Sequence, residues 1–366
     1  MGQAPNAVAE RPRPRQSATG DSRTFAALDL GTNNCRLLIA TPTARGFRII
    51  DAYSRIVRLG EGLSRTGRLS DGAMERAIHA LSVCADKIGR RGAQRVRAVA
   101  TQACRSAANG AQFVEEVAAR TGLRLSIISP REEARLSVAG CLSLLDREAD
   151  AALVLDVGGG STELSWIDLA APGLDVEPRR LAHWRLPIRA WISVPVGVVT
   201  LAERFPEADP PDAAWFRSMV EAMKSHIAPF RDADCLREAF TTGRAHLVGT
   251  SGAITSLAGL HLGLPRYDRN QVDGLWMTRG ECEAAAGRLI GLSQVERGRQ
   301  PCIGSDRADL VLAGAAILQA VQELWPCERV RVADRGLREG LLLSLMSERR
   351  RGRSRRRRGG RAADPA

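Results

Sequence analysis

Short apolar runs in the first half of the chain alternate with segments in which apolar residues recur every three or four positions. Three apolar runs come first, joined by the turns GTNN and ARG, and they predict three strands in two tight hairpins. Helical spacing begins behind Ser70, a residue suited to cap a helix. The first half therefore predicts the order βββαβαβα. Its expected strands are 24–30, 35–41, 47–57, 96–101 and 124–129, and two further helices are expected at 109–121 and 131–145.

The second half repeats this order. A strand at 151–157 leads through the turn GGGST into a strand at 163–169, and a polar insert separates both from a third strand at 189–197. In this repeat LDLGTN of the first half aligns with LDVGGGST of the second, and such an internal repeat predicts a duplicated fold. The remaining expected elements are helices at 211–230, 251–260, 281–292, 308–325 and 336–347 and strands at 244–250 and 328–334.

Two βββαβαβα halves, each opening with strand-Asp-x-Gly-turn-strand, resemble the actin-like ATPase superfamily. This is an α/β fold of two ribonuclease H-like units, and the resemblance implies an active site in the interdomain cleft. A chain of 366 residues with 44% hydrophobic residues is long enough for two such domains. We expect a disordered leader at 1–22, an N-terminal domain at 23–148, a C-terminal domain at 149–346 and a disordered tail at 347–366.

The predicted tail is rich in arginine. It has nine arginines and two acidic residues, and so it contributes more than half of the net charge of +12. Such a run suits binding of a polyanion such as RNA, polyphosphate or an acidic membrane, although a solvated tail without a specific partner explains it equally well.

The cysteines and the apolar runs exclude other classes. Eight cysteines occur without C-x-x-C spacing, which indicates reduced, mostly buried thiols of a cytoplasmic protein and not a zinc site. The longest apolar-rich run, 310–321, is too short to span a bilayer and predicts a core helix.

Two matching turns suggest the chemistry. Asp29 and Asp156 each lie at the end of a predicted strand and are followed by glycine and small polar residues. The free N–H groups of such turns form a nest for phosphate oxygens, and glycine allows close approach. Because a carboxylate repels phosphate, both aspartates are expected to hold a bridging Mg²⁺ ion. One Asp-x-Gly turn alone would be explained better as a capped hairpin, but two at matched positions favour a phosphate site.

A third turn of this kind, LVGTSGAITSLAG at 247–259, lies between a strand and a helix. A helix N-terminus there is compatible with an anion or a nucleoside. A capped helix start explains this turn better.

Several motifs occur together and in order between residues 23 and 346: FAALDLGTNNCRLLIA, IISPREEARLSVAG, LVLDVGGGSTEL, LVGTSGAITSLAG and ADRGLREGLL. In this combination the chain resembles the family of exopolyphosphatases and guanosine pentaphosphate phosphohydrolases (Ppx/GppA). It is similar to the short form, which lacks the C-terminal HD-type domain. The resemblance implies Mg²⁺-dependent hydrolysis of a terminal phosphoanhydride.

The resemblance also implies roles for individual residues. Glu133 would be the catalytic base, Asp156 would support the metal and the attacking water, and Arg105 would face the phosphates. Glu163 is expected to assist Asp156. The expected metal ligands are Asp29, Asp156 and Glu163. The residues expected to hold phosphate are Gly31, Thr32, Asn33, Gly158, Gly159, Gly160 and Ser161.

Four functions remain to be compared at this point. Exopolyphosphatase activity, which releases orthophosphate from polyphosphate, is the main hypothesis, and hydrolysis of guanosine pentaphosphate (pppGpp) is the alternative. A kinase or ATPase of the same superfamily is disfavoured by the EEAR motif. A regulatory protein that binds polyphosphate, (p)ppGpp or RNA without catalysis is disfavoured by intact Glu133 and Asp156. The family resemblance also makes a homodimer an expectation.

Overall fold

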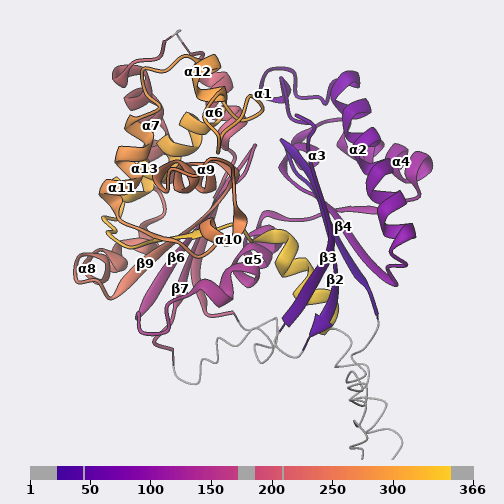
Figure 1. Ribbon diagram of the computed structural model, residues 1–366, viewed down its shortest axis with the longest axis horizontal. Helices are drawn as coiled ribbons and strands as arrows, with labels where there is room; N and C mark the ends of the chain where they lie inside the picture. The colour runs from indigo at the N-terminus through magenta and orange to yellow at the C-terminus, as the bar shows by residue number, and fades with distance from the viewer. Residues whose placement is uncertain (1–22, 44–45, 172–185, 208–209, 348–366) are drawn as a thin grey trace, which may run out of the picture.

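The computed structural model describes residues 23–43, 46–171, 186–207 and 210–347, which fold into two α/β lobes (Figure 1). A cleft is lined by residues of both lobes. The predicted leader at 1–22 and residues 348–366 of the predicted tail lie outside the described residues. The structure shows two lobes. The expected domain boundary between residues 148 and 149 stays a prediction.

The first lobe contains a five-stranded sheet of order β3-β2-β1-β4-β5. The first three strands are antiparallel, and β4 and β5 are parallel to β1, as the predicted hairpins and crossovers require. The Ser70 hydroxyl accepts a hydrogen bond from the Ala73 N–H and caps α2 as predicted. The strands are β1 (Phe25–Leu30), β2 (Asn34–Thr43), β3 (Gly46–Ile56), β4 (Arg95–Ala100) and β5 (Leu125–Ile127). The helices are α1 (Leu63–Thr66), α2 (Asp71–Arg90), α3 (Gln102–Ser106), α4 (Gly110–Thr121) and α5 (Pro130–Cys141).

The second lobe repeats this sheet and adds one strand. Its order is β10-β11-β9-β6-β7-β8, so that β8-β7-β6-β9-β11 corresponds strand by strand to the first sheet. The strands are β6 (Ala151–Val157), β7 (Thr162–Asp168), β8 (Ile188–Val194), β9 (Ala245–Thr250), β10 (Trp276–Met277) and β11 (Val330–Ala333). The helices are α6 (Val198–Arg204), α7 (Ala213–Ile227), α8 (Leu236–Thr241), α9 (Gly252–His261), α10 (Arg269–Val272), α11 (Arg279–Gly287), α12 (Gln294–Gly298) and α13 (Val311–Leu324).

This topology confirms the duplicated actin-like fold that the sequence predicts. Two details differ. The strand predicted at 189–197 ends at Val194, because Pro195 has no N–H to donate to the ladder, and the helix α6 begins directly after Gly197. Strand β10 has only two residues and is too short for an alternating pattern.

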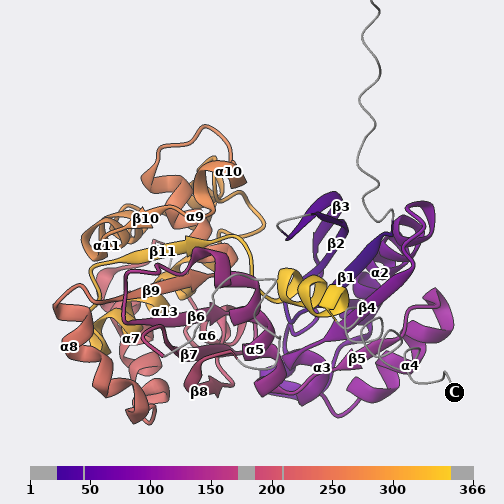
Figure 2. The ribbon, with the colours of Figure 1, turned by 90° about the horizontal axis from the view of Figure 1, so that it is seen from below.

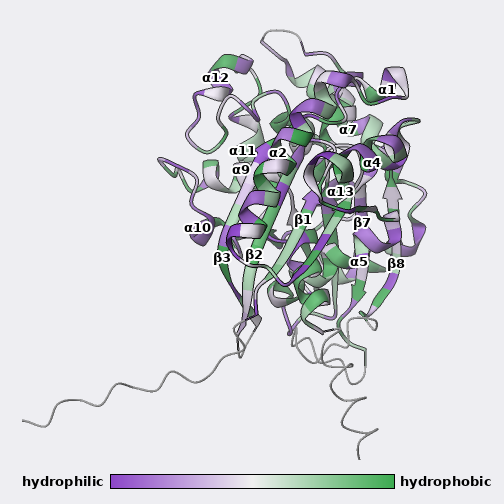
Figure 3. Ribbon diagram, turned by 90° about the vertical axis from the view of Figure 1, so that its right-hand side faces the viewer, coloured by the Kyte–Doolittle hydropathy of each residue, from purple (hydrophilic) through white to green (hydrophobic). Residues whose placement is uncertain are grey.

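Alternation along the strands explains why helices cover both faces of the first sheet. Ala26, Leu28 and Leu30 of β1 face the core beneath α2 and α4. The intervening residues Phe25 and Ala27 face the opposite core. Helix α2 correspondingly mixes hydrophobic and hydrophilic residues, whereas β1 and β2 are mainly hydrophobic (Figure 3).

Two helices cross between the lobes. Helix α5 packs through Val138 and Cys141 against the second sheet. The final helix, 337–347, packs against the first sheet (Figure 2). Glycines allow the crossing, because a methyl group at Gly140 would lie 1.9 Å from the carbonyl oxygen of Gly336. The chain thus passes between the lobes twice at one point of close backbone contact.

The cysteines are as the sequence predicts. All eight are free thiols, and seven of them are buried. The sulfur atoms of Cys35 and Cys84 are 3.9 Å apart in the core of the first lobe. Within the described part of the chain, every helix is too short or too polar to cross a membrane.

Buried His246 makes the stability of the second lobe sensitive to pH. The side chain is fully buried in β9, and burial lowers the pKa of His246 from 6.5 to about 4. The unfolded chain therefore binds a proton at higher pH than the folded chain, so stability is complete above pH 6.5 and falls toward pH 4. We expect protonation of His246 to lower the free energy of unfolding by about 3 kcal/mol on acidification.

Urea unfolding of the wild type and of His246→Gln at pH 7 and pH 4.5 measures this effect. The variant should lose less stability on acidification than the wild type. His79→Gln, which replaces an exposed histidine of α2, is the control and should keep the wild-type dependence. Equal losses in the wild type and His246→Gln would contradict the assignment.

Candidate active site

A cleft of about 320 Å³ lies between the lobes, where the ends of β1 and β6 face each other. Both predicted turns line it. Their backbones are in close contact, because a methyl group at Gly159 would lie 3.0 Å from Cβ of Thr32 and 3.1 Å from the backbone nitrogen of Asn33. The structure therefore brings together two turns that are more than a hundred residues apart in the sequence.

The first turn, residues 31–33, is held by its neighbours within the first lobe. The Gly31 N–H donates to the Asn34 carbonyl at 2.8 Å, which closes the turn. The Asn33 carbonyl accepts from the N–H groups of Val57 and Arg58. Asn33 is buried, and its side-chain oxygen has no hydrogen-bond partner. The carbonyl oxygens of the turn thus face its own lobe, and a buried polar atom is left for a ligand or water.

The second turn, residues 158–161, is held by the start of α6. The Gly158 N–H donates to the Ser161 carbonyl at 2.9 Å. The N–H groups of Val198 and Val199 donate to the carbonyls of Gly158 and Gly159, at 3.0 and 2.8 Å. These bonds orient the carbonyls of the turn toward α6. The sequence did not predict that α6 holds this turn.

Glu133 lies on the first turn of α5 and lines the cleft. Ser129 caps this helix by accepting from the Glu132 N–H. Burial raises the pKa of Glu133 well above its usual value, and the neighbouring Glu163 carboxylate raises it further. Such a carboxylate takes up a proton more readily than one in water.

Arg105 contacts Glu133 and does not line the cleft. Its guanidinium donates to Glu133 Oε2 at 3.1 Å, to the Ile128 carbonyl at 2.6 Å and to the side chain of Gln102. The guanidinium therefore fixes the orientation of Glu133, and a direct contact of Arg105 with phosphate stays a prediction.

Two further carboxylates line the cleft on equivalent strands. Burial raises the pKa of Asp29 to about 6, and it also raises the pKa of Asp156. Arg36 lies directly opposite Asp29 on β2, and Glu163 lies opposite Asp156 on β7. Burial, and to a smaller extent the negative charge of Asp156, raises the pKa of Glu163 to about 7. The site thus concentrates acidic groups in a buried place, where a cation would relieve their repulsion.

Of the predicted site residues, Glu163 and Arg105 lie behind the walls of the cleft. Glu163 is buried, and its carboxylate accepts a hydrogen bond from the Ser193 hydroxyl at 2.7 Å. The predicted residues that line the cleft are Asp29, Gly31, Thr32, Asn33, Glu133, Asp156, Gly158, Gly159, Gly160 and Ser161.

The sequence matches the model of the Ppx/GppA phosphatase family over residues 38–349. The chain belongs to this family. It is 29% identical over 333 residues to "Exopolyphosphatase 2" of Mycobacterium tuberculosis, covering 87% of this chain and 98% of that protein. It is 27% identical to "Guanosine-5'-triphosphate,3'-diphosphate pyrophosphatase" of Aeromonas salmonicida, covering 89% of this chain but only 60% of that relative.

A solved structure of a Ppx/GppA family member from Aquifex aeolicus is similar, with a TM-score of 0.72 and 29% identity over 89% of this chain and 98% of that one. An exopolyphosphatase structure from Cytophaga hutchinsonii has a TM-score of 0.78 at 21% identity, over 89% of this chain and 98% of that chain, and supports the fold alone. The family membership expected from the motifs is therefore confirmed.

The Ppx/GppA site also contains cations that sequence reasoning missed. Five arginines from four segments line the cleft: Arg36, Arg269, Arg307, Arg335 and Arg338. Arg36 had a signal as a charged residue inside an apolar strand, and Arg335 and Arg338 lie in the motif ADRGLREGLL, but no role was predicted for any of the five. The third Gly-Ser/Thr turn contributes Thr250, Ser251 and Gly252 to the same wall.

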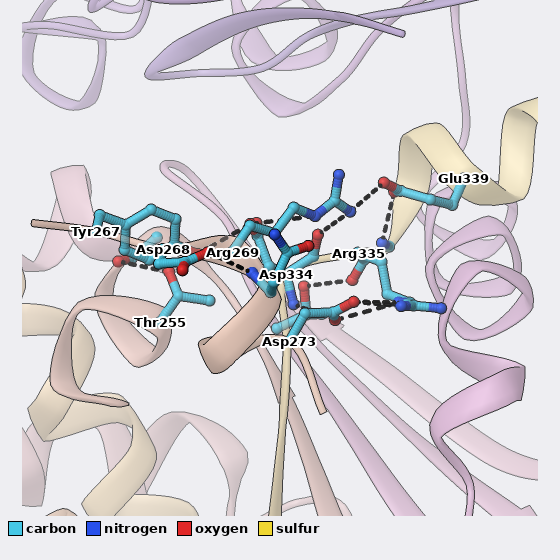
Figure 4. Close-up of polar contacts among 12 residues, drawn as sticks. Thr255, Tyr267, Asp268, Arg269, Asp273, Asp334, Arg335 and Glu339 are labelled. Atoms are coloured by element: carbon cyan, nitrogen blue, oxygen red, sulfur yellow. Dashed lines mark hydrogen bonds and ion pairs between the residues drawn. The ribbon is translucent and has the colours of Figure 1, made fainter. Parts of the chain in front are cut away.

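A polar network fixes part of this wall, as Figure 4 shows. Arg269 donates to Glu339 Oε1 at 3.0 Å, and the Gly336 N–H donates to Glu339 Oε2 at 2.9 Å. Arg335 is paired with Asp273, and the Tyr267 hydroxyl donates to Asp334 at 2.9 Å. The carboxylates hold these arginines in place, so that the wall can attract an anion without large side-chain rearrangement.

The residues fit a magnesium ion that is bound together with a substrate. Asp29 and Asp156 supply the hard oxygen ligands that Mg²⁺ prefers, and Asp29 Oδ1 is buried without a hydrogen-bond partner. Among the residues described, no group of three or more acidic, histidine or cysteine side chains is placed so that it could hold a metal ion by itself, and a metal set of Asp29, Asp156 and Glu163 stays a prediction. This is compatible with Mg²⁺, which usually keeps several waters and binds one or two carboxylates plus substrate phosphates.

Proposed function

We propose that this protein is an exopolyphosphatase that hydrolyses the terminal phosphoanhydride of polyphosphate and releases orthophosphate. The observation that carries the proposal is the contact between the two glycine turns inside an arginine-lined cleft that Glu133 also lines. The similarity to "Exopolyphosphatase 2", which extends over nearly the whole of that relative, favours polyphosphate over pppGpp.

The mechanism follows from the positions of these side chains. The N–H groups of residues 32–33 and 159–161 bind the terminal phosphate, since those of Gly31 and Gly158 close the turns, and the arginines of the cleft neutralise the rest of the anion. Glu133, held by Arg105, accepts the proton of the attacking water at its carboxylate. Asp29 and Asp156 would hold Mg²⁺, which when bound neutralises phosphate charge. Glu163 supports Asp156 from the adjacent strand.

Hydrolysis of pppGpp remains the second candidate, because one relative is named a guanosine-5'-triphosphate,3'-diphosphate pyrophosphatase. The cleft is also lined by Tyr267, an aromatic side chain of the kind that stacks on a guanine base. Cytoplasmic location, a homodimer and a contact of the arginine-rich tail with RNA or polyphosphate are further proposals. The location rests on the cysteine pattern and the homodimer on the family resemblance. The contact of the tail rests on the sequence alone, since residues 348–366 lie outside the described part of the chain.

Phosphate release from polyphosphate, pppGpp and ATP, each with Mg²⁺ and with EDTA, tests the function. We expect polyphosphate to be hydrolysed fastest and EDTA to abolish release. Faster hydrolysis of pppGpp would favour the alternative, and normal polyphosphate binding without hydrolysis of any substrate would favour a regulatory binding protein.

A further inference from the structure

The segment 57–66, which joins β3 to α2, contacts both lobes. It contains Arg58, which has a φ of 48° and is the one non-glycine residue with positive φ in the part of the chain that the structure describes. This conformation is uncommon for a residue with a Cβ atom and costs free energy. Surrounding contacts must therefore hold Arg58 in place.

The side chain of Arg58 reaches the second lobe. Its guanidinium pairs with Asp309 Oδ2 at 2.7 Å. Asp309 directly precedes Leu310 and Val311, which line the cleft, and its other oxygen is buried without a partner. A second contact lies nearby, because Glu203 of α6 accepts hydrogen bonds from the Gly62 N–H and the Ser64 hydroxyl. The segment is thus tied to the second lobe at two points.

The backbone of the same segment supports the first phosphate turn. The N–H groups of Val57 and Arg58 donate to the Asn33 carbonyl at 2.9 and 3.0 Å, and the Gly60 N–H donates to the Thr32 carbonyl at 2.9 Å. Packing is equally close, because a methyl group at Gly60 would lie 2.2 Å from Cγ2 of Thr32. A displacement of the segment would therefore displace the turn.

We infer that Arg58 and Asp309 are positioning residues whose ion pair holds the first phosphate turn in register with the second lobe. The inference rests on the proposed function of the cleft. An ion pair as exposed as this one, with side-chain exposures of 38% and 21%, contributes little to global stability. Its effect on the reaction is larger, because both turns must meet the same phosphate, and a misplacement of about 1 Å can cost roughly 100-fold in rate.

The test compares Arg58→Asn and Asp309→Asn with the wild type. Asparagine adopts positive φ readily, so the first variant removes the charge with little added backbone strain. We expect kcat on polyphosphate to fall roughly 10- to 100-fold, with a smaller change in KM and almost no change in melting temperature. The reversed pair Arg58→Asp with Asp309→Arg should recover most of the lost activity, since aspartate also tolerates this conformation.

Arg120→Gln is the control, because it removes ion pairs with Glu75 and Glu116 that lie entirely within the first lobe, and the 43% exposure of the Arg120 side chain is close to the 38% of Arg58. Its kinetics should equal those of the wild type. Wild-type kcat in Arg58→Asn and Asp309→Asn would overturn the inference, and so would a reversed pair as impaired as the single variants.

Amide hydrogen exchange separates this inference from the proposed function. Loss of the ion pair should speed exchange at Val57, Arg58 and Gly60, whose N–H groups donate to the carbonyls of the turn. This readout does not require activity. A wild type that releases no phosphate from any substrate would refute the proposed function, whereas unchanged exchange in both asparagine variants would refute the positioning role.

Discussion

Replacing Glu133 by glutamine should lower phosphate release from polyphosphate by roughly 1,000-fold, because general base catalysis contributes about 100- to 10,000-fold. Glutamine keeps the shape of the side chain and can still accept a hydrogen bond from Arg105, but it cannot take a proton from water. Burial and the neighbouring Glu163 raise the pKa of Glu133, and this makes the carboxylate a stronger base than an exposed one. Binding of polyphosphate should change only a few-fold.

Initial rates and equilibrium binding of polyphosphate measure the two effects separately. Glu132→Gln is the control, because the adjacent carboxylate lies on the same helix turn, is paired with Arg97 and has a side-chain exposure of 39%. It should keep most of the activity. A Glu133→Gln variant that retains more than a tenth of the wild-type rate would place the base elsewhere.

Replacing Gly197 by alanine should lower kcat/KM roughly 100-fold by displacing the second phosphate turn. The methyl group would lie 2.4 Å from the Gly158 carbonyl oxygen and 2.5 Å from the Gly159 carbonyl carbon. These are backbone atoms of the turn, so no side-chain rotation relieves the clash. Gly197 has φ −126° and ψ −170°, an extended conformation that alanine adopts freely, and the effect is therefore due to contact alone.

Kinetics and thermal melting of Gly197→Ala, compared with Gly287→Ala, isolate this contact. Gly287 lies in α11 with no heavy atom within 4 Å of an added methyl group. Its alanine variant should have wild-type rates and slightly higher stability, because alanine favours helix. Wild-type rates in Gly197→Ala would show that the position of the 158–161 turn does not control the reaction.

Both glycine turns of the cleft could be found from the sequence because their signals are local. Asp29 and Asp156 each end an apolar strand before glycines, and the repeat of this pattern indicates that the two turns are equivalent. Duplicated sheets then bring equivalent strand ends to one cleft. Glu133 and Arg105 required the family resemblance, since a carboxylate at the start of a helix is ordinary by itself.

Other residues of the site could not be found in this way. Gly197 was expected at the end of a strand, and only packing against Gly158 and Gly159 makes it a part of the site. Arg58 appears in the sequence as one arginine of many. Its contact with Asp309, 251 positions away, depends on how the lobes are placed.

The sequence by itself determined the order of the long strands and helices, the duplication and the two turns, because hydrophobic periodicity and glycine turns act over a few residues, and its motifs indicated the family. The tertiary structure alone decided that Arg105 faces Glu133, that five arginines gather along one cleft, and that residues 57–60 tie the first turn to the second lobe. These contacts join segments distant in the chain, and their geometry is set by the packing of whole lobes, which no local pattern encodes.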